Sequence, residues 1–95
     1  HWADPIAMMQ VTTTGCAQIV KIIKGLADEL CRGRLVLTLE GGYELTALAT
    51  SVKATLDVLL GNANIEDPLG KSQRGFTAPD IAPLIEEIKR IHGLG

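Results

Sequence analysis

The chain has 95 residues, of which 46% are hydrophobic but only 3% aromatic, and its formal net charge is −2. This length allows one small domain with an aliphatic core. Acidic and basic residues are interspersed, so we expect no nucleic-acid or anionic-membrane partner, and no apolar run approaches the roughly 20 residues that span a bilayer.

The first residues, His1 to Pro5, are predicted to be irregular, because proline disfavours helix at the residue before it. The chain starts with histidine rather than methionine, so we expect it to be processed, tagged or cut from a longer protein. His1 and Asp4 could in principle bind a metal. A metal site needs three or four ligands, however, and a histidine near a chain end is more often solvated. We therefore expect no metal site here.

Apolar residues at helical spacing predict an amphipathic helix over residues 13–31, preceded by threonines that offer an N-cap. Gly33 is expected to end this helix. Cys16 and Cys31 would lie about 22 Å apart for a rise of about 1.5 Å per residue, which is too far for a disulfide. Two unpaired thiols fit a reducing compartment, so we expect a cytoplasmic location.

A short apolar run, Leu35–Leu39, lacks polar alternation, which is typical of a strand buried on both faces of a parallel sheet. Gly41 and Gly42 are expected to stop the strand, because glycine reaches backbone angles closed to other residues. Tyr43 would then follow the carboxyl end of a buried strand, where open α/β sheets bind ligands. The alternative is a simple strand-to-helix turn with a tyrosine that packs, since Gly-Gly commonly marks turns.

A second helix is predicted over residues 45–60, again from the helical spacing of its apolar residues. Glu44 would lie near its N-terminus, where a negative charge suits the helix dipole, and Gly61 is the expected C-cap. The order helix–strand–helix with short links predicts a layered α/β architecture.

A connection and a third helix complete the chain. Residues 62–78 are rich in Asn, Asp, Gly and Pro, which predicts a surface connection. Its expected apolar anchors are Ile65, Leu69 and Phe76. Pro79 and Asp80 suit the first turn of a helix within residues 79–95. His92 lies in the last turn of that helix, and we see no catalytic partner for it.

Several stretches carry a resemblance to a known family. They are His1-Trp2-Ala3-Asp4-Pro5-Ile6-Ala7-Met8-Met9, Thr12-Thr13-Thr14-Gly15, Arg34-Leu35-Val36-Leu37-Thr38-Leu39-Glu40-Gly41-Gly42-Tyr43 and Leu60-Gly61. Together they resemble the C-terminal part of a zinc-dependent histone deacetylase, most of all the bacterial histone deacetylase-like amidohydrolases and class II enzymes. The resemblance covers about the first two-thirds of the chain.

This resemblance implies a fold. The chain would be a helix–strand–helix–loop–helix slice of the arginase–deacetylase fold, a parallel sheet covered by helices. Residues 1–61 would form the deacetylase-like α/β segment, residues 62–78 the surface connection and residues 79–95 the C-terminal helix.

The resemblance also implies a chemistry, the zinc-dependent hydrolysis of acetyl-lysine or related acylated amines. It makes Tyr43 the donor that stabilises the developing oxyanion on the carbonyl oxygen. Gly41 and Gly42 would form the pocket wall beside the acyl group. The family's zinc ligands, two aspartates and a histidine, fall outside this chain, and His1 matches a position that is not a ligand. Glu44 stands where the family usually has asparagine, which puts the turn after Tyr43 in doubt.

Two hypotheses follow. In the first, the chain is a fragment of a deacetylase-like enzyme, inactive alone, whose partner is the missing N-terminal part. In the second, it is a free-standing binding or assembly module that keeps only the packing. An independent hydrolase is not expected, because no zinc-binding set is present. A lone strand leaves its backbone groups unpaired, so we also expect self-association, most simply as a two-fold dimer through Leu35–Leu39. The alternative is that this segment abandons strand structure and joins the helices.

Overall fold

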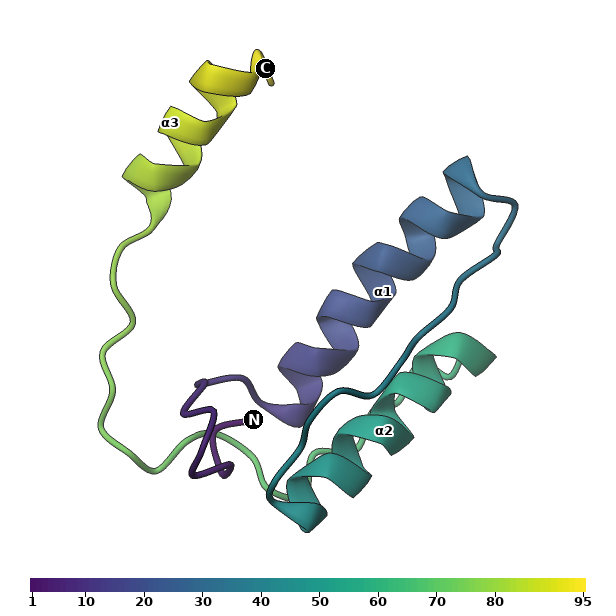
Figure 1. Cartoon of the computed structure of the whole chain (residues 1–95), viewed down its shortest axis with the longest axis vertical. Coiled ribbons are helices and arrows are strands. Elements are labelled where there is room, and N and C mark those ends of the chain that lie inside the picture. The colour runs from purple at the N-terminus through teal and green to yellow at the C-terminus, as the bar shows by residue number, and fades with distance from the viewer.

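The computed structural model describes all 95 residues and contains three helices and no β-strand. The helices are α1 (Thr13–Leu30), α2 (Leu45–Leu60) and α3 (Ala82–His92). α1 and α2 lie side by side, whereas α3 stands apart from both (Figure 1). The Cα radius of gyration is 15.3 Å, larger than the value of about 12 Å expected for a compact domain of this length. The molecule is therefore open, with one packed helix pair.

Local sequence signals set both ends of α1. Thr12 is the N-cap, and its Oγ1 accepts a hydrogen bond from the N–H of Gly15 at 3.0 Å. Beyond the last turn, Gly33 has a φ of +75°, and its N–H donates to the carbonyl of Ala27 at 2.9 Å. The predicted first helix is confirmed to within one residue.

The second predicted helix is confirmed in full as α2. Glu44 is its N-cap, because its carboxylate accepts a hydrogen bond from the N–H of Ala47. Gly61 is the C-cap with a φ of +81°, as expected. Glu44 thus caps the helix that follows the turn.

The core of the molecule is small and built from small side chains. The buried cluster consists of Ala17, Ala54 and Val58, with Val20 and Ile65 packed against it. Alanines at the contact let α1 and α2 approach closely. Only seven of 95 residues are buried, so both helices keep apolar side chains exposed to solvent. Ile65 is confirmed as an anchor of the connection, and Leu69 is half-buried.

The predicted α/β slice of a parallel sheet is wrong for this chain, because the structure has no strand and no sheet. Leu35–Leu39 runs back beside α1 and α2 (Figure 1), yet residues 35–42 make no backbone–backbone hydrogen bond. A strand requires a neighbouring strand to pair with its N–H and C=O groups, and this chain has one strand-forming run. Helices can cover such a run but cannot satisfy its backbone. The segment is consequently exposed, with Val36 at 86%.

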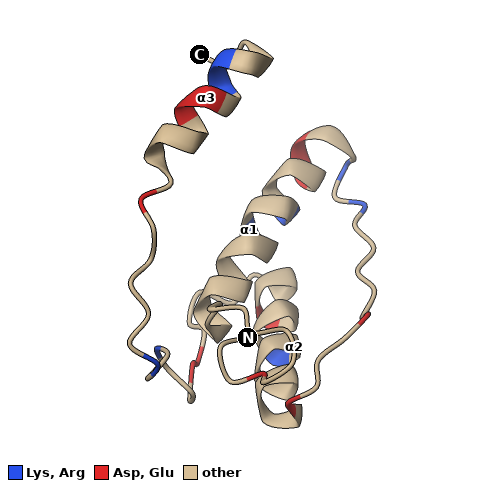
Figure 2. Ribbon diagram, turned by 60° about the vertical axis from the view of Figure 1, so that its left-hand side comes forward, with Lys and Arg blue, Asp and Glu red and all other residues tan.

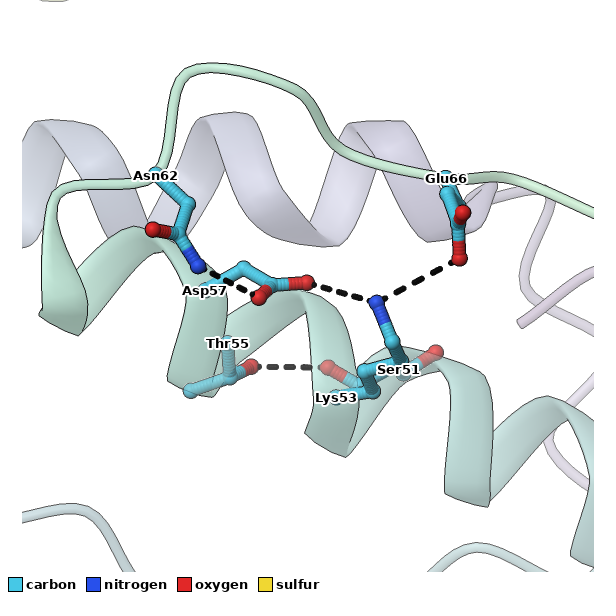
Figure 3. A network of polar contacts seen from close by, with 6 residues as sticks. All are labelled: Ser51, Lys53, Thr55, Asp57, Asn62 and Glu66. Carbon is cyan, nitrogen blue, oxygen red and sulfur yellow. Dashed lines mark hydrogen bonds and ion pairs between the residues drawn. The ribbon is translucent and has the colours of Figure 1, made fainter.

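Polar contacts tie the start of the 62–78 connection to α2 (Figure 3). Lys53 Nζ lies 3.0 Å from Asp57 Oδ2 and 3.4 Å from Glu66 Oε2. Asn62 Nδ2 donates to Asp57 Oδ1 at 2.8 Å. This bond, followed by the one from Lys53, lowers the pKa of Asp57. Ion pairs of this exposed kind stabilise a fold only weakly, so we assign the network a role in shaping the turn.

The C-terminal part of the chain departs from expectation in two ways. Phe76 is 72% exposed, so its prediction as an anchor is wrong. α3 begins at Ala82, and Pro79 and Asp80 precede it, with Asp80 Oδ1 accepting from the N–H of Ala82 at 3.0 Å. The helix ends at His92, so His92 lies in its last turn, as predicted. Its apolar stripe is exposed and comprises Ile81, Leu84, Ile85, Ile88 and Ile91. The division of the chain at residues 61 and 78 stays a prediction.

Charged residues of both signs are scattered over the three helices and their connections (Figure 2). Ion pairs form within helices, as between Lys24 and Asp28 at 2.7 Å in α1 and between Glu87 and Arg90 at 2.6 Å in α3. A membrane-spanning helix would have to be longer and more apolar than any helix of this chain.

Candidate functional site

The candidate site is the turn before α2, where Tyr43 follows two glycines. The N–H of Tyr43 donates to Oδ2 of Asp4, 39 residues earlier in the chain, at 2.8 Å. Tyr43 is 59% exposed. Tyr43 is therefore not part of the buried cluster of Ala17, Ala54 and Val58.

Asp4 is a buried acid, only 4% exposed, and its two oxygens accept three backbone N–H groups. Oδ1 accepts from Ile6 at 2.9 Å and from Ala7 at 3.1 Å, which makes an Asx turn. The hydrogen bond from Tyr43, followed by those from Ala7 and Ile6, lowers the pKa of Asp4. The carboxylate is therefore ionised at neutral pH and serves as a fixed acceptor for the Tyr43 backbone.

The two glycines before Tyr43 have different roles. Gly42 has a φ of +109°, and a Cβ there would lie 2.7 Å from Cδ1 of Leu48. At Gly41 a Cβ would lie 3.7 Å from Cε2 of Tyr43 and 3.8 Å from its hydroxyl oxygen, which is ordinary contact. Gly42 is thus required by the backbone of the turn, whereas Gly41 leaves space open beside the phenol.

Substitution of Gly42 by alanine is expected to destabilise the turn by about 1–3 kcal/mol, because a side chain is strained at this positive φ. Gly41→Ala is the matched control and should have a much smaller effect. Urea unfolding followed by circular dichroism, together with amide exchange at Tyr43, measures both. Equal effects of the two substitutions would contradict the different roles assigned to these glycines.

The N-terminal segment is fastened to the helix pair through His1. Its Nδ1 accepts from the N–H of Ala3 at 3.1 Å, and its Nε2 lies 3.3 Å from Oγ1 of Thr13. Oγ1 of Thr13 lies 3.3 Å from that of Thr50 in α2. His1 is thus half-buried and hydrogen-bonded, and the expectation of a solvated histidine is wrong.

No group of three or more His, Cys, Asp or Glu side chains is placed to hold a metal ion. The residues of this chain therefore do not fit a zinc site.

A second carboxylate, Asp67, fastens the 62–78 connection to α1. Its Oδ2 accepts from the N–H and the hydroxyl of Thr14, both at 3.1 Å, and its Oδ1 accepts from the N–H of Gly70 at 2.8 Å. The carbonyl of Gly70 in turn accepts from Nε1 of Trp2 at 2.8 Å. Burial raises the pKa of Asp67, but the hydrogen bonds from Thr14 and Gly70 outweigh burial, and the net pKa is lowered.

Neither carboxylate's anchoring role was expected from the sequence, although a signal was present. Asp4-Pro5 and Asp67-Pro68 are both Asp-Pro dipeptides. Aspartate at the start of a turn commonly bonds the backbone two or three residues later. What the sequence could not indicate is which distant element each second oxygen would bind.

Acid is expected to break the hydrogen bonds that the carboxylates of Asp4 and Asp67 accept. The pKa values of Asp4 and Asp67 are lowered in the folded chain, so their stabilising contribution is present above the ordinary value of 3.8 and is lost as the pH falls below it. The fluorescence of Trp2, the single tryptophan, should therefore change in a transition below about pH 3.8. Asp67→Asn should remove most of this transition, whereas Asp80→Asn should preserve it. A fluorescence signal that is flat down to pH 2 would contradict the assignment.

The site is a surface turn, since Tyr43 is 59% exposed, and Tyr43 lines neither of the two principal hollows of the molecule. The more apolar hollow, about 500 Å³, lies between the extended segment and the helix pair. Its lining consists of Val20, Leu35, Leu37, Thr38, Leu39, Val52, Thr55, Leu56 and Leu59.

Comparison with known proteins gives a consistent result. The family model of the histone deacetylase domain matches residues 1–59, which include Tyr43. Histone deacetylase 14, chloroplastic, of Arabidopsis thaliana is 36% identical over 99% of this chain and 23% of its own length. Histone deacetylase 10, chloroplastic, of Oryza sativa subsp. japonica is 34% identical over 99% of this chain and 22% of its own. A probable deacetylase of Archaeoglobus fulgidus is 29% identical over 97% of this chain and 28% of its own length.

The chain spans about a quarter of the length of these relatives. No solved structure matches it significantly.

Proposed function

The chain belongs to the histone deacetylase family, and from that premise we propose that it is the C-terminal segment of a deacetylase and supplies Tyr43 to the hydrolysis of acetyl-lysine or a related acylated amine. The observation that carries the proposal is the state of Tyr43. Its backbone N–H is held by a buried carboxylate, while the residue as a whole is 59% exposed and lies within the region that matches the family.

In this proposal the phenol acts as a fixed hydrogen-bond donor. When water adds to the acyl carbonyl, negative charge develops on the carbonyl oxygen. A donor already positioned at that oxygen stabilises the transition state more than the ground state. Gly41, which has no side chain, leaves room for the acyl group beside the hydroxyl.

Zinc chemistry, which the family resemblance implies, would depend on residues outside this chain, because residues 1–95 contain no fitting ligand set. The isolated chain is accordingly proposed to be inactive. The proposal also places it in a reducing compartment such as the cytoplasm, since Cys16 and Cys31 are both free thiols.

A chimera tests the proposed function. In it, residues 1–95 replace the matching 96-residue region of the Arabidopsis thaliana relative. The chimera should hydrolyse an acetyl-lysine peptide, and the same relative with that region deleted should not. The isolated chain should bind no stoichiometric zinc by elemental analysis and show no hydrolysis above background. Tightly held zinc and deacetylation in the isolated chain would contradict the proposal.

The second candidate function is a free-standing assembly module. The observation that favours it is the exposed apolar surface of the extended segment and of α3. Its partner would be a second copy of the chain, whereas the fragment hypothesis requires the missing N-terminal part of the enzyme. An active chimera would favour the fragment, and a chimera that is folded but inactive would favour the module.

A further inference from the structure

The link between Asp4 and Tyr43 has an unusual place among the contacts of the molecule. It is the only hydrogen bond made by residues 35–43, the segment that leads from α1 back to α2. It is also the only hydrogen bond that joins residues 1–11 to that segment. One carboxylate oxygen therefore provides the whole polar attachment of the turn that carries the phenol.

The loop that presents Asp4 is closed on itself. The N–H of Trp2 donates to the carbonyl of Val11 at 2.8 Å, and the N–H of Asp4 donates to the carbonyl of His1 at 3.0 Å. Oδ1 of Asp4 is occupied by the Asx turn, so Oδ2 is directed to Tyr43. A hydrogen bond to an ionised acceptor is stronger than one between neutral groups.

We propose that Asp4 is a positioning residue for Tyr43: its carboxylate holds the backbone from which the phenol reaches the acyl carbonyl. This inference rests on the proposed function of Tyr43. Asp4 itself does not contact the substrate. It acts by limiting the positions that the phenol can take, so that the donor is in place before charge develops on the substrate.

The contact itself can be measured by NMR in the unaltered chain. Coupling across the hydrogen bond between the Tyr43 amide nitrogen and the Asp4 carboxyl carbon should be detectable. The coupling from the Ile6 amide to the same carboxyl, with a 2.9 Å hydrogen bond, is the internal reference. Detection of the Ile6 coupling without the Tyr43 coupling would overturn the proposal, and this measurement needs no variant to fold.

Asp4→Asn provides the matching substitution. Asparagine has one carbonyl oxygen and one amide group, and the amide cannot accept from an N–H, so the Asx turn and the Tyr43 bond cannot both survive. Exchange of the Tyr43 amide should accelerate about tenfold or more, while the Gly15 amide stays protected. Asp80→Asn is the control, because Asp80 also accepts from a backbone N–H two residues later but has no link to Tyr43. Unchanged Tyr43 exchange in Asp4→Asn would overturn the proposal.

The catalytic readout uses the chimera. Asp4→Asn should lower kcat about tenfold or more with little change in KM, and it should have almost no further effect once Tyr43 is phenylalanine. An equal loss in both backgrounds would show a merely structural role and contradict the proposal. If Tyr43→Phe alone retains full activity, the proposed function fails, whereas the NMR and exchange results still decide the contact.

Discussion

Replacement of Tyr43 by phenylalanine in the chimera is expected to lower kcat by about 100- to 1000-fold, the usual scale for the loss of one oxyanion donor. Phenylalanine keeps the ring that lies beside Gly41 and removes only the hydroxyl. The Asp4 contact involves the Tyr43 backbone and is retained. The loss should therefore appear in kcat and in kcat/KM to a similar extent.

Structural controls separate catalysis from folding in this variant. Circular dichroism, thermal stability and zinc content of the Tyr43→Phe chimera should equal those of the unaltered chimera. A rate unchanged by the substitution would mean that Tyr43 is not the oxyanion donor. If both the rate and the helix content fall, hydrogen exchange of the Tyr43 amide should be measured to show whether the substitution has disturbed the turn.

Self-association of the isolated chain is the second large effect that we expect. Residues 35–42 make no backbone hydrogen bond, and Val36 and Leu39 are 86% and 68% exposed. Burying unpaired N–H and C=O groups costs about 1–3 kcal/mol each, so apolar burial of this segment requires a backbone partner. A second copy can supply one. Sedimentation should show a dimer at micromolar concentration, and a stable compact monomer would contradict the prediction.

The positions of two charged residues predict the register in which the two copies pair. Arg34 and Glu40 lie at equal distances on either side of Leu37. Two copies that pair antiparallel about a two-fold axis at Leu37 would bring Arg34 of one opposite Glu40 of the other at both ends. Neither side chain forms an ion pair within the chain.

Charge reversal tests the register. Arg34→Glu should weaken the dimer, because it sets two acids opposite each other, and the double variant Arg34→Glu with Glu40→Arg should restore it. Equal dimerisation by all three chains would contradict this register. The dimer of the unaltered chain should dissociate faster at high salt, because salt screens the attraction between exposed charges.

The helices could be predicted because their signals are local. Thr12, Glu44 and Gly61 act within a few residues of the ends that they determine. The start of α3 was placed too early, since Pro79 and Asp80 suit a first turn but precede the helix at Ala82. The strand predicted at Leu35–Leu39 is absent, because a strand depends on partner segments that local sequence does not describe.

Only part of the candidate site could be predicted from the sequence. Tyr43 and its glycines stand in one continuous motif, so the motif and the family resemblance pointed to them together. The contact with Asp4 spans 39 residues and depends on how the N-terminal loop closes. The sequence offered the Asp-Pro dipeptide as a turn signal, but only the folded chain shows what the free carboxylate oxygen binds.

The most direct test of the central claim is one distance in a crystal structure of the chimera with a bound, non-hydrolysable analogue of acetyl-lysine. In the chimera with Tyr43 and a non-hydrolysable acyl analogue, the phenol oxygen should lie about 2.5–3.0 Å from the acyl carbonyl oxygen. A phenol directed away from the bound acyl group, beyond hydrogen-bond distance, would contradict the account.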